Sequence, residues 1–138
     1  MDLPVMEKMT TPIKVKKIKE LIGKTFVKIE GAIGGDEIVF TTKRGKQYKF
    51  YHAQDCCESV TVEDICGDIN DLIGSPLTVA EETSSHTNPP GVNIASEYQD
   101  SFTWTFYRFA TVKGLVTIRW YGSSNGYYSE RVAFIKIN

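Results

Sequence analysis

The sequence predicts an α+β fold in which two helices pack on antiparallel β-sheet, and three observations lead to this prediction. Apolar residues recur at approximately helical spacing in two segments, 13–22 and 61–73. Three β-rich runs follow the first segment, and three more make up the last third of the chain. Glycine-containing turns separate most of these runs, as hairpins between antiparallel strands require.

The chain has the size of one domain with its own core. It contains 138 residues, 41% of them hydrophobic, and we expect a single domain over 1–138. No run approaches the roughly 18 apolar residues of a membrane span, and the segment MDLPVMEKMTTP lacks the apolar core of a signal peptide. We therefore expect a soluble protein made in the cytosol.

The first half of the sequence predicts a short helix and a meander. Thr11 and Pro12 are suited to begin a helix that ends at Gly23. The runs KTFVKIE, EIVFTT and QYKFYH follow, with turns at Gly34-Gly35-Asp36 and at Lys43-Arg44-Gly45-Lys46. Their β-branched and aromatic residues predict three antiparallel strands at 24–30, 37–42 and 47–52.

A second helix is predicted at 61–73, before the sequence Gly74-Ser75-Pro76. Thr61 is followed at the third residue by Asp64, which resembles a capping box. Apolar residues at helical spacing support it: Val62, Ile65, Ile69, Leu72 and Ile73.

The remaining sequence predicts a strand, a long loop and a three-stranded sheet. PLTVAEE (76–82) is the strand, and the segment 84–100 is rich in Ser, Asn, Pro and Gly. Loops of that length in a small domain tend to be functional or mobile. The runs 101–111, 115–121 and 127–137 are joined by Lys113-Gly114 and by a turn that contains Asn-Gly, so we predict that they pair as three antiparallel strands.

The charges are unevenly distributed. Residues 1–50 carry 11 Lys and Arg against 6 Asp and Glu, and no basic side chain lies between Lys49 and Arg108. An acidic middle section is a poor surface for nucleic acid, because duplex binding needs basic groups on the phosphates. The lysines near residues 14–19 form a weak basic patch, which we interpret as a solvated helix face. Extended DNA or RNA binding is not predicted.

The stretch HAQDCCE (52–58) has three interpretations. As a metal site it offers His52 and Cys56, but zinc needs three or four ligands, and Cys66 and His86 are distant in the sequence. As the active site of a Cys/His enzyme, the stretch would need a cysteine thiolate as its nucleophile. As a structural junction between the first sheet and the second helix, it would pack its small thiol side chains under that helix, and we favour this interpretation.

Two further observations disfavour chemistry at this stretch. Asp55 and Glu58 flank the adjacent cysteines, and negative neighbours raise a thiol pKa. Adjacent cysteines rarely bridge, so we predict reduced thiols at Cys56, Cys57 and Cys66. No common hydrolase, metalloprotease or phosphate-loop motif is present, and the acidic residues of 63–71 are interpreted as a solvated face. We expect no catalytic residues, no metal and no cofactor.

The C-terminal strands carry the most informative surface. A turn at Lys113-Gly114 would set Arg108 opposite Arg119, a like-charge pair that needs an anion or a carboxylate such as Glu130 nearby. Alternation places Phe102, Trp104 and Phe106 on one face and Tyr107, Phe109, Ile118 and Trp120 on the other. The sequence does not indicate which face is core.

Aromatic rings beside arginines suit a nucleotide-like ligand, because bases stack on rings and guanidinium groups bind phosphate oxygens. Two alternatives remain open, in which the aromatic residues fill a sheet core or form an oligomer interface. The candidate ligand-binding residues are Arg108, Arg119, Arg131, Trp104, Trp120, Tyr121, Asn125, Tyr127, Tyr128 and His52.

The chain also resembles a family of small proteins encoded largely by bacteriophages. The resemblance rests on ELIGKTFVKIEG, FYHAQDCCESVTVEDICGDINDLIGSPLTVAEE and DSFTWTFYRFATVKGLVTIRWYGSSNGYYSERV, from about Lys19 to Val132. By type, the chain is similar to phage sponge proteins such as the Thoeris anti-defence family. Those proteins sequester cyclic ADP-ribose isomers or cyclic oligonucleotides without cutting them, commonly as oligomers.

The resemblance implies a non-enzymatic phage protein that captures a nucleotide-derived immune signal in the cytoplasm of the infected bacterium. It implies a small-molecule partner, a homo-oligomer, and no extended nucleic acid or membrane. Two alternatives are kept: an inhibitor that binds a host defence protein through the aromatic residues, and an enzyme that uses His52 with Cys56 or Asp55 on a nucleotide signal.

Overall fold

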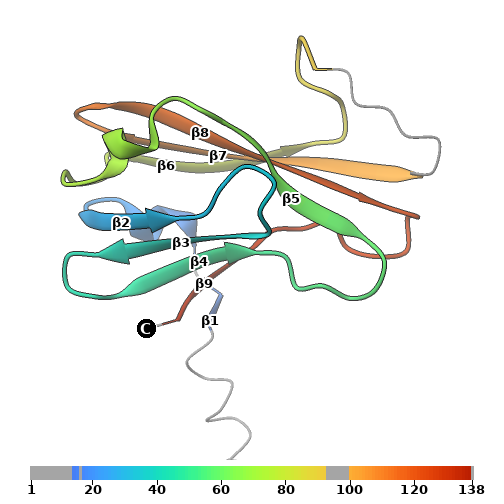
Figure 1. Cartoon of the computed structure of the whole chain (residues 1–138), viewed down its shortest axis with the longest axis horizontal. Coiled ribbons are helices and arrows are strands. Elements are labelled where there is room, and N and C mark those ends of the chain that lie inside the picture. Colours follow the sequence, from blue (N-terminus) through green and yellow to red (C-terminus); the bar gives the residue numbers. More distant parts are fainter. Residues whose placement is uncertain (1–13, 16, 93–99, 138) are drawn as a thin grey trace, which may run out of the picture.

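The computed structural model describes residues 14–15, 17–92 and 100–137, and this part of the protein is a sandwich of two antiparallel β-sheets (Figure 1). One sheet has five strands in the order β1-β9-β4-β3-β2, and the other has four in the order β5-β8-β7-β6. The α+β prediction is therefore wrong. The described residues contain no α-helix, only two 3-10 helices of four residues each.

The elements follow one another along the chain as short strands with two helical turns. They are β1 (Lys14–Val15), η1 (Ile18–Leu21), β2 (Phe26–Glu30), β3 (Glu37–Thr42), β4 (Gln47–Tyr51), β5 (Ser59–Cys66), η2 (Ile69–Leu72), β6 (Val79–Ser85), β7 (Ser101–Thr111), β8 (Gly114–Ser124) and β9 (Ala133–Lys136). No helix among the described residues is long and apolar enough to cross a membrane.

The predicted N-terminal meander is confirmed. Strands β2, β3 and β4 pair antiparallel in sequence order, and alternate residues of β3 and β4 are buried, including Ile38, Phe40 and Phe50. This alternation is what the β-rich runs predicted, because successive side chains of a strand point to opposite faces of the sheet.

The two sheets meet in an aromatic core centred on Phe50. Its ring lies 5.4 Å from that of Phe40 and 4.7 Å from that of Phe134 within its own sheet. It also lies 4.8 Å from the ring of Tyr107 and 5.8 Å from the ring of Phe109 in the facing sheet. All these centroid distances are in the range at which aromatic pairs attract each other.

The predicted helix at 61–73 is wrong. Residues 59–66 form strand β5, and only 69–72 make a helical turn. Val60 and Val62 are buried against the core, and a bulge between Val62 and Asp64 shifts the pairing with β8. Because the bulge interrupts strict alternation, the apolar residues on either side fall at a spacing that resembles a helix.

The predicted first helix is also wrong over the described residues. Lys14–Val15 form the short strand β1 against β9, and the helical turn covers only Ile18–Leu21. Leu21 is fully buried there and anchors the turn. The proposed start of the helix, Thr11-Pro12, and residue 13 lie outside the described residues.

The predicted strand at 76–82 is present as β6, which pairs with β7 and continues to residue 85. It therefore takes the first residues of the predicted 84–100 loop. Residues 93–99 of that loop lie outside the described part of the chain.

The predicted three-stranded C-terminal sheet is confirmed only for β7 and β8. After the Asn125-Gly126 turn the chain crosses to the other sheet, where β9 pairs with β4 and β1. Phe134 lies directly opposite Phe50 there. The crossing places an apolar strand beside the aromatic core, and β8 is already paired on both edges, with β5 and with β7.

The register of the β7–β8 hairpin differs from the predicted one by two residues. Thr111 pairs with Gly114, so Arg108 lies opposite Thr117 and not opposite Arg119. The Thr111 hydroxyl accepts a hydrogen bond from the Lys113 amide at 3.1 Å, which fixes the tighter turn. A shift of two residues keeps each side chain on the same face, so the predicted division of aromatic residues between the faces holds.

Replacement of Gly67 with alanine is expected to lower the free energy of unfolding by about 2–3 kcal/mol. Gly67 has a φ of +107°, and an added Cβ would meet the Leu115 carbonyl oxygen at 2.6 Å. Denaturant unfolding of Gly126→Ala is the control, because Gly126 has a φ of +93° but open space around the added atom. That variant should lose about 1 kcal/mol, and equal losses in both variants would contradict the steric argument.

Candidate functional site

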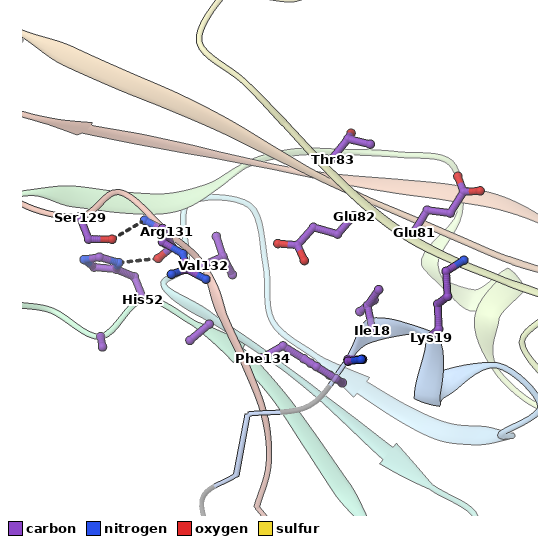
Figure 2. Close-up of a pocket in the computed structure, with 13 residues that line it drawn as sticks. Ile18, Lys19, His52, Glu81, Glu82, Thr83, Ser129, Arg131, Val132 and Phe134 are labelled. Atoms are coloured by element: carbon purple, nitrogen blue, oxygen red, sulfur yellow. Dashed lines mark hydrogen bonds between the residues drawn. The ribbon is translucent and has the colours of Figure 1, made fainter.

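A pocket lies between the two sheets, on the side bounded by β6 and by residues 129–134 (Figure 2). Its volume of about 950 Å³ is in the range of small-molecule sites. Four chain segments line it: Lys17, Ile18 and Lys19; His52 and Ala53; Glu81, Glu82 and Thr83; and Ser129, Arg131, Val132, Ala133 and Phe134.

The pocket has basic side chains at both ends, and Glu81 lies near Lys19 at one of them (Figure 2). Figure 2 shows Arg131 at one end beside Ser129, and Lys19 at the other end. The guanidinium of Arg131 has no ion pair with any residue in the described part of the chain, and the residue is exposed. Lys17 and Lys19 are exposed as well. Arg131 can therefore bind an anion without first leaving a protein partner.

The floor of the pocket is apolar. Ile18 is half-buried, and Val132 and Phe134 are each only 6% exposed. The Phe134 ring stacks on Tyr48 at a centroid distance of 5.8 Å, so the core supports it from below. Such a floor can bury the apolar part of a ligand whose charged groups contact the rim.

Two carboxylates interrupt the basic lining. The Tyr107 hydroxyl donates a hydrogen bond of 3.1 Å to Glu82 Oε2. Burial and the negative charge of Glu82 raise the pKa of Tyr107, so the hydroxyl keeps its proton and remains a donor. Glu81 Oε1 lies 3.9 Å from Arg108 Nη1, in a pair that is half exposed on both sides.

His52 is held from both sides of its ring. Nδ1 lies 2.6 Å from the backbone oxygen of Arg131, and Nε2 lies 2.6 Å from Glu58 Oε2. Both neighbours are acceptors, so a ring nitrogen that carries a proton donates to the neighbour it faces. His52 thereby ties the backbone at Arg131 to the end of β4 and orients one end of the pocket.

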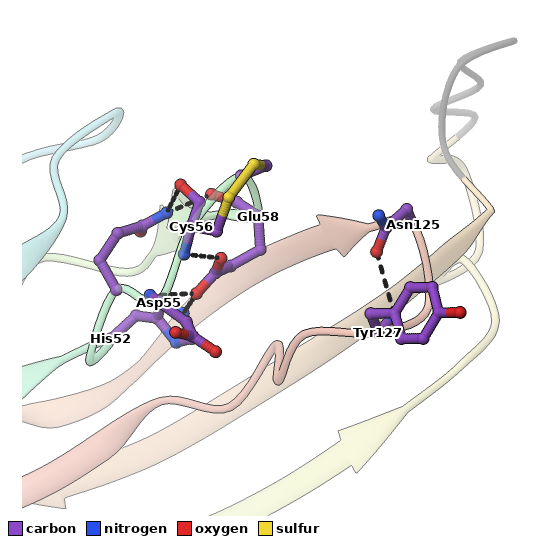
Figure 3. Close-up of a disulfide and its surroundings, with 8 residues drawn as sticks. His52, Asp55, Cys56, Glu58, Asn125 and Tyr127 are labelled. Atoms are coloured by element: carbon purple, nitrogen blue, oxygen red, sulfur yellow. Dashed lines mark hydrogen bonds and ion pairs between the residues drawn. A yellow bond between two sulfur atoms is a disulfide. The ribbon is translucent and has the colours of Figure 1, made fainter.

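Glu58 organises the loop that supports His52 (Figure 3). Its side chain is fully buried and accepts hydrogen bonds from the backbone amides of Asp55 at 2.8 Å and Cys56 at 2.9 Å. Burial alone would raise the pKa of Glu58, but the hydrogen bonds from His52 and the amides of Cys56 and Asp55 lower it from 4.5 to about 2. Glu58 is ionised at neutral pH.

The Glu58 carboxylate is expected to make folding stability depend on pH below neutrality. Its pKa is lower in the folded protein than in the unfolded chain, so the stabilisation is complete above about pH 4.5 and is lost as the pH falls to about 2. Glu58→Gln should lower Tm at pH 7 by several degrees and should flatten the Tm profile over that window. Thermal melts from pH 7 to pH 2.5 measure this.

The matched control for this titration is Glu30→Gln, an exposed glutamate paired with Lys28 at 3.3 Å. Its pH profile should follow that of the wild-type protein. Parallel profiles for the wild-type protein and Glu58→Gln would show that Glu58 is not the group that titrates.

Cys56 and Cys57 form a disulfide between adjacent residues, so the prediction of reduced thiols is wrong for this pair (Figure 3). Gln54 Nε2 donates to the backbone oxygens of Cys56 and Glu58, which fixes the tight turn in which the two sulfur atoms meet. Neither sulfur is a thiolate in this state. Cys66 is a free, exposed cysteine. In the described chain, no group of three or more His, Cys, Asp or Glu side chains is arranged to hold a metal ion.

The predicted aromatic face with Phe102, Trp104 and Phe106 is the outer face of the four-stranded sheet, directed away from the other sheet. Trp104 is fully buried there: it stacks on Phe106 at 6.0 Å, contacts Tyr121 edge-on at 5.0 Å, and donates through Nε1 to Asn88. Trp120 is on the inner face and is 1% exposed. Neither tryptophan ring has an open face for a ligand.

The two arginines of β7 and β8 have acidic partners. Arg119 donates through Nε and Nη2 to both oxygens of Asp64 at 2.6 Å, a bond that raises the pKa of Arg119. Arg108 faces Glu81, as described above. Glu130 does not lie between these arginines as predicted, because its carboxylate accepts hydrogen bonds from the hydroxyls of Thr103 and Ser124, each at 2.6 Å.

The remaining candidates lie at the tip after β8. Asn125 Oδ1 accepts a hydrogen bond from the Tyr127 amide at 3.0 Å. Tyr127 is 88% exposed and Tyr128 is half-buried. Figure 3 shows this tip apart from the His52 loop. Of the ten candidate residues, the structure therefore brings only His52 and Arg131 together at the pocket.

Several pocket residues were not predicted from the sequence, although some of them lie in segments with a recognisable pattern. Lys17 and Lys19 were noted as a basic patch but were placed on a solvated helix face. Glu82 was counted only as part of the acidic middle section. Ser129 and Phe134 carried no signal, because their position depends on β9 crossing between the sheets.

A family model described as a domain of unknown function (DUF7448) matches residues 19–134. No curated protein matches the chain, and no solved structure does either. The matched segment contains every residue of the pocket lining except Lys17 and Ile18. The pocket is therefore built almost entirely from the part of the chain that the family model describes.

Proposed function

The chain belongs to the family described as a domain of unknown function (DUF7448), and on this premise we propose that it captures a nucleotide-derived immune signal. In this proposal the protein is a bacteriophage anti-defence protein that acts in the cytoplasm of the infected bacterium. It binds a cyclic ADP-ribose isomer or a cyclic oligonucleotide without cleaving it, needs no cofactor, and works as a homo-oligomer.

The observation that carries the proposal is the pocket that contains Arg131. A cavity of about 950 Å³ has room for a nucleotide-sized molecule. Guanidinium groups bind phosphate oxygens through paired hydrogen bonds, and Arg131 has no competing ion pair among the described residues. Lys17 and Lys19 add positive charge, and the apolar floor accepts the remainder of the ligand.

Capture without cleavage is supported by the partners of the titratable groups around the pocket. His52 has hydrogen-bond partners at both ring nitrogens. Tyr107 donates its hydroxyl to Glu82. A general base needs a free acceptor within reach of the proton that it removes. His52, placed between two acceptors, is suited to fixing the pocket wall.

Differential scanning fluorimetry with cyclic ADP-ribose, cyclic di-AMP, cyclic di-GMP and ADP-ribose tests the proposal. Saturating ligand should raise Tm by several degrees through mass action. Heating the complex should then release the ligand intact, as chromatography of the supernatant measures. Absence of any shift over the panel would overturn binding, and recovery of a cleaved product would favour an enzyme that uses His52. Light scattering on the eluted protein measures the oligomeric state.

The exposed tip of the β8–β9 connection favours a second candidate function, inhibition of a host defence protein by direct binding. Tyr127 is 88% exposed there, and tyrosine is enriched at protein interfaces. A pull-down from bacterial lysate that retains a host protein with the wild-type chain, but not with Tyr127→Ala, would support this candidate. Retention of a small molecule by both forms would support capture.

A further inference from the structure

Two carboxylates lie in the pocket wall: Glu81 faces Arg108, and the second is Glu82. It lies on the edge strand β6, and Figure 2 shows its carboxylate between Arg131 at one end of the pocket and Lys19 at the other. Tyr107 donates to Oε2, and no other residue in the described ranges donates a hydrogen bond to this side chain. Glu82 is an exposed residue, and only its Oε2 has a hydrogen-bond partner among the described residues.

A carboxylate in this position acts against simple anions. A phosphate bound at Arg131 would share the pocket with a fixed negative charge, and like charges repel each other even in a partly hydrated site. The same carboxylate favours a ligand that presents N–H or O–H groups, since a charged acceptor forms stronger hydrogen bonds than a neutral one. Such a carboxylate would distinguish ligands by the groups attached to their phosphate.

Tyr107 makes this arrangement rigid. The ring is 1% exposed and packs on Phe50 in the core. Its hydroxyl holds Oε2 of Glu82, so the carboxylate is positioned by the core as well as by its own strand. A positioned acceptor loses less conformational entropy on binding than a free side chain does.

We propose that Glu82 is the specificity-determining residue of the pocket: it selects molecules that carry hydrogen-bond donors next to a phosphate and rejects bare phosphates. The ribose hydroxyls and the amino groups of a purine are such donors, whereas inorganic pyrophosphate offers only the protonated oxygens of a highly charged anion. This inference rests on the proposed function. It names the residue by which the pocket would distinguish a nucleotide from a phosphate or pyrophosphate alone.

Isothermal titration of the wild-type protein and Glu82→Gln tests the inference, with the four nucleotides of the thermal panel and inorganic pyrophosphate as probes. Glutamine keeps the shape of the side chain but removes its charge. The variant should bind the best nucleotide about tenfold more weakly, because a charge-assisted hydrogen bond is lost. It should bind pyrophosphate about fivefold more tightly, because a repulsion of about 1 kcal/mol is removed.

Two further variants define the outcome. Glu63→Gln replaces an exposed glutamate of β5, outside the pocket, and should leave both affinities unchanged. Tyr107→Phe removes the hydroxyl that holds Glu82. It should reproduce part of the change that Glu82→Gln causes in the ratio of nucleotide affinity to pyrophosphate affinity. If a nucleotide binds the wild-type protein and Glu82→Gln leaves this ratio unchanged, the inference fails and the proposed function stands. If no nucleotide of the panel binds, both fail.

Discussion

Replacement of Phe50 with alanine is expected to lower the free energy of unfolding by about 3–5 kcal/mol. The Phe50 ring contacts Phe40 and Phe134 in its own sheet and Tyr107 and Phe109 in the facing sheet. Alanine leaves a cavity at the point where the two sheets meet, and the surrounding rings cannot fill it without losing their own contacts. Since small domains have stabilities of about 5–15 kcal/mol, much of the total is lost.

Urea unfolding followed by tryptophan fluorescence measures this loss. Leu115→Ala is the matched control, because Leu115 is also a large apolar residue on a strand but is 48% exposed. It should change the free energy of unfolding by about 0.5 kcal/mol or less. If the two variants unfold at similar urea concentrations, Phe50 does not hold the sheets together.

If the protein binds a nucleotide as proposed, replacement of Arg131 with alanine is expected to weaken that binding by about 10- to 100-fold, with little change in Tm of the free protein. Hydrogen bonds to charged groups are worth about 1.5–3 kcal/mol each, and this range sets the size of the loss. The effect on folding is small, because His52 bonds to the backbone oxygen of Arg131. This bond does not involve the side chain that the substitution removes. Titration calorimetry and thermal melts separate the two quantities.

The control for Arg131 is Arg44→Ala, an exposed arginine in the turn between β3 and β4, outside the pocket. It removes the same charge from the protein and should leave affinity within about twofold at physiological salt, because separated surface charges are screened. Equal weakening by both variants would mean that binding follows overall charge and not the pocket. No weakening by Arg131→Ala would remove the pocket as the site.

The strands of this protein could be predicted where local alternation is regular. Every second residue of 37–42 is buried and the residues between them are more accessible, and β3 has the bounds that the sequence predicts. Residues 59–66 are different, because the bulge near Asp64 changes the phase of the alternation. The apolar residues beyond it then belong to a turn, yet Val62, Ile65 and Ile69 keep a helix-like spacing. Local spacing could not distinguish a bulged strand followed by a turn from a helix.

The partner of the last strand could not be predicted from local signals. Asn125-Gly126 marks a turn correctly, but a turn does not specify the sheet to which the chain returns. That choice depends on Phe134, which packs on Phe50 and Tyr48 of the N-terminal meander. Contacts between segments so far apart in the sequence leave no periodic pattern.

The pocket could be predicted only in part for the same reason. His52 and Arg131 were selected for their chemistry, and the structure brings them to one end of the cavity. Lys19 and Glu82 come from two other segments, and nothing in their neighbouring residues indicates that they face the same cavity. The aromatic residues and arginines of β7 and β8 were predicted as ligand contacts from their residue types. Trp104 and Arg119 instead bond to other side chains of the protein.

The crossing of β9 between the sheets also determines the order in which the protein can fold. β9 lies next to β4 in the sheet, although more than half of the sequence separates these two strands along the chain. Until residues 133–136 leave the ribosome, β4 has an unpaired edge beside Tyr48 and Phe50, and such edges favour aggregation during synthesis. Contacts between distant segments also slow folding. Because residues 129–134 form one wall of the pocket, the pocket is complete only after this segment has been synthesised and β9 has paired with β4.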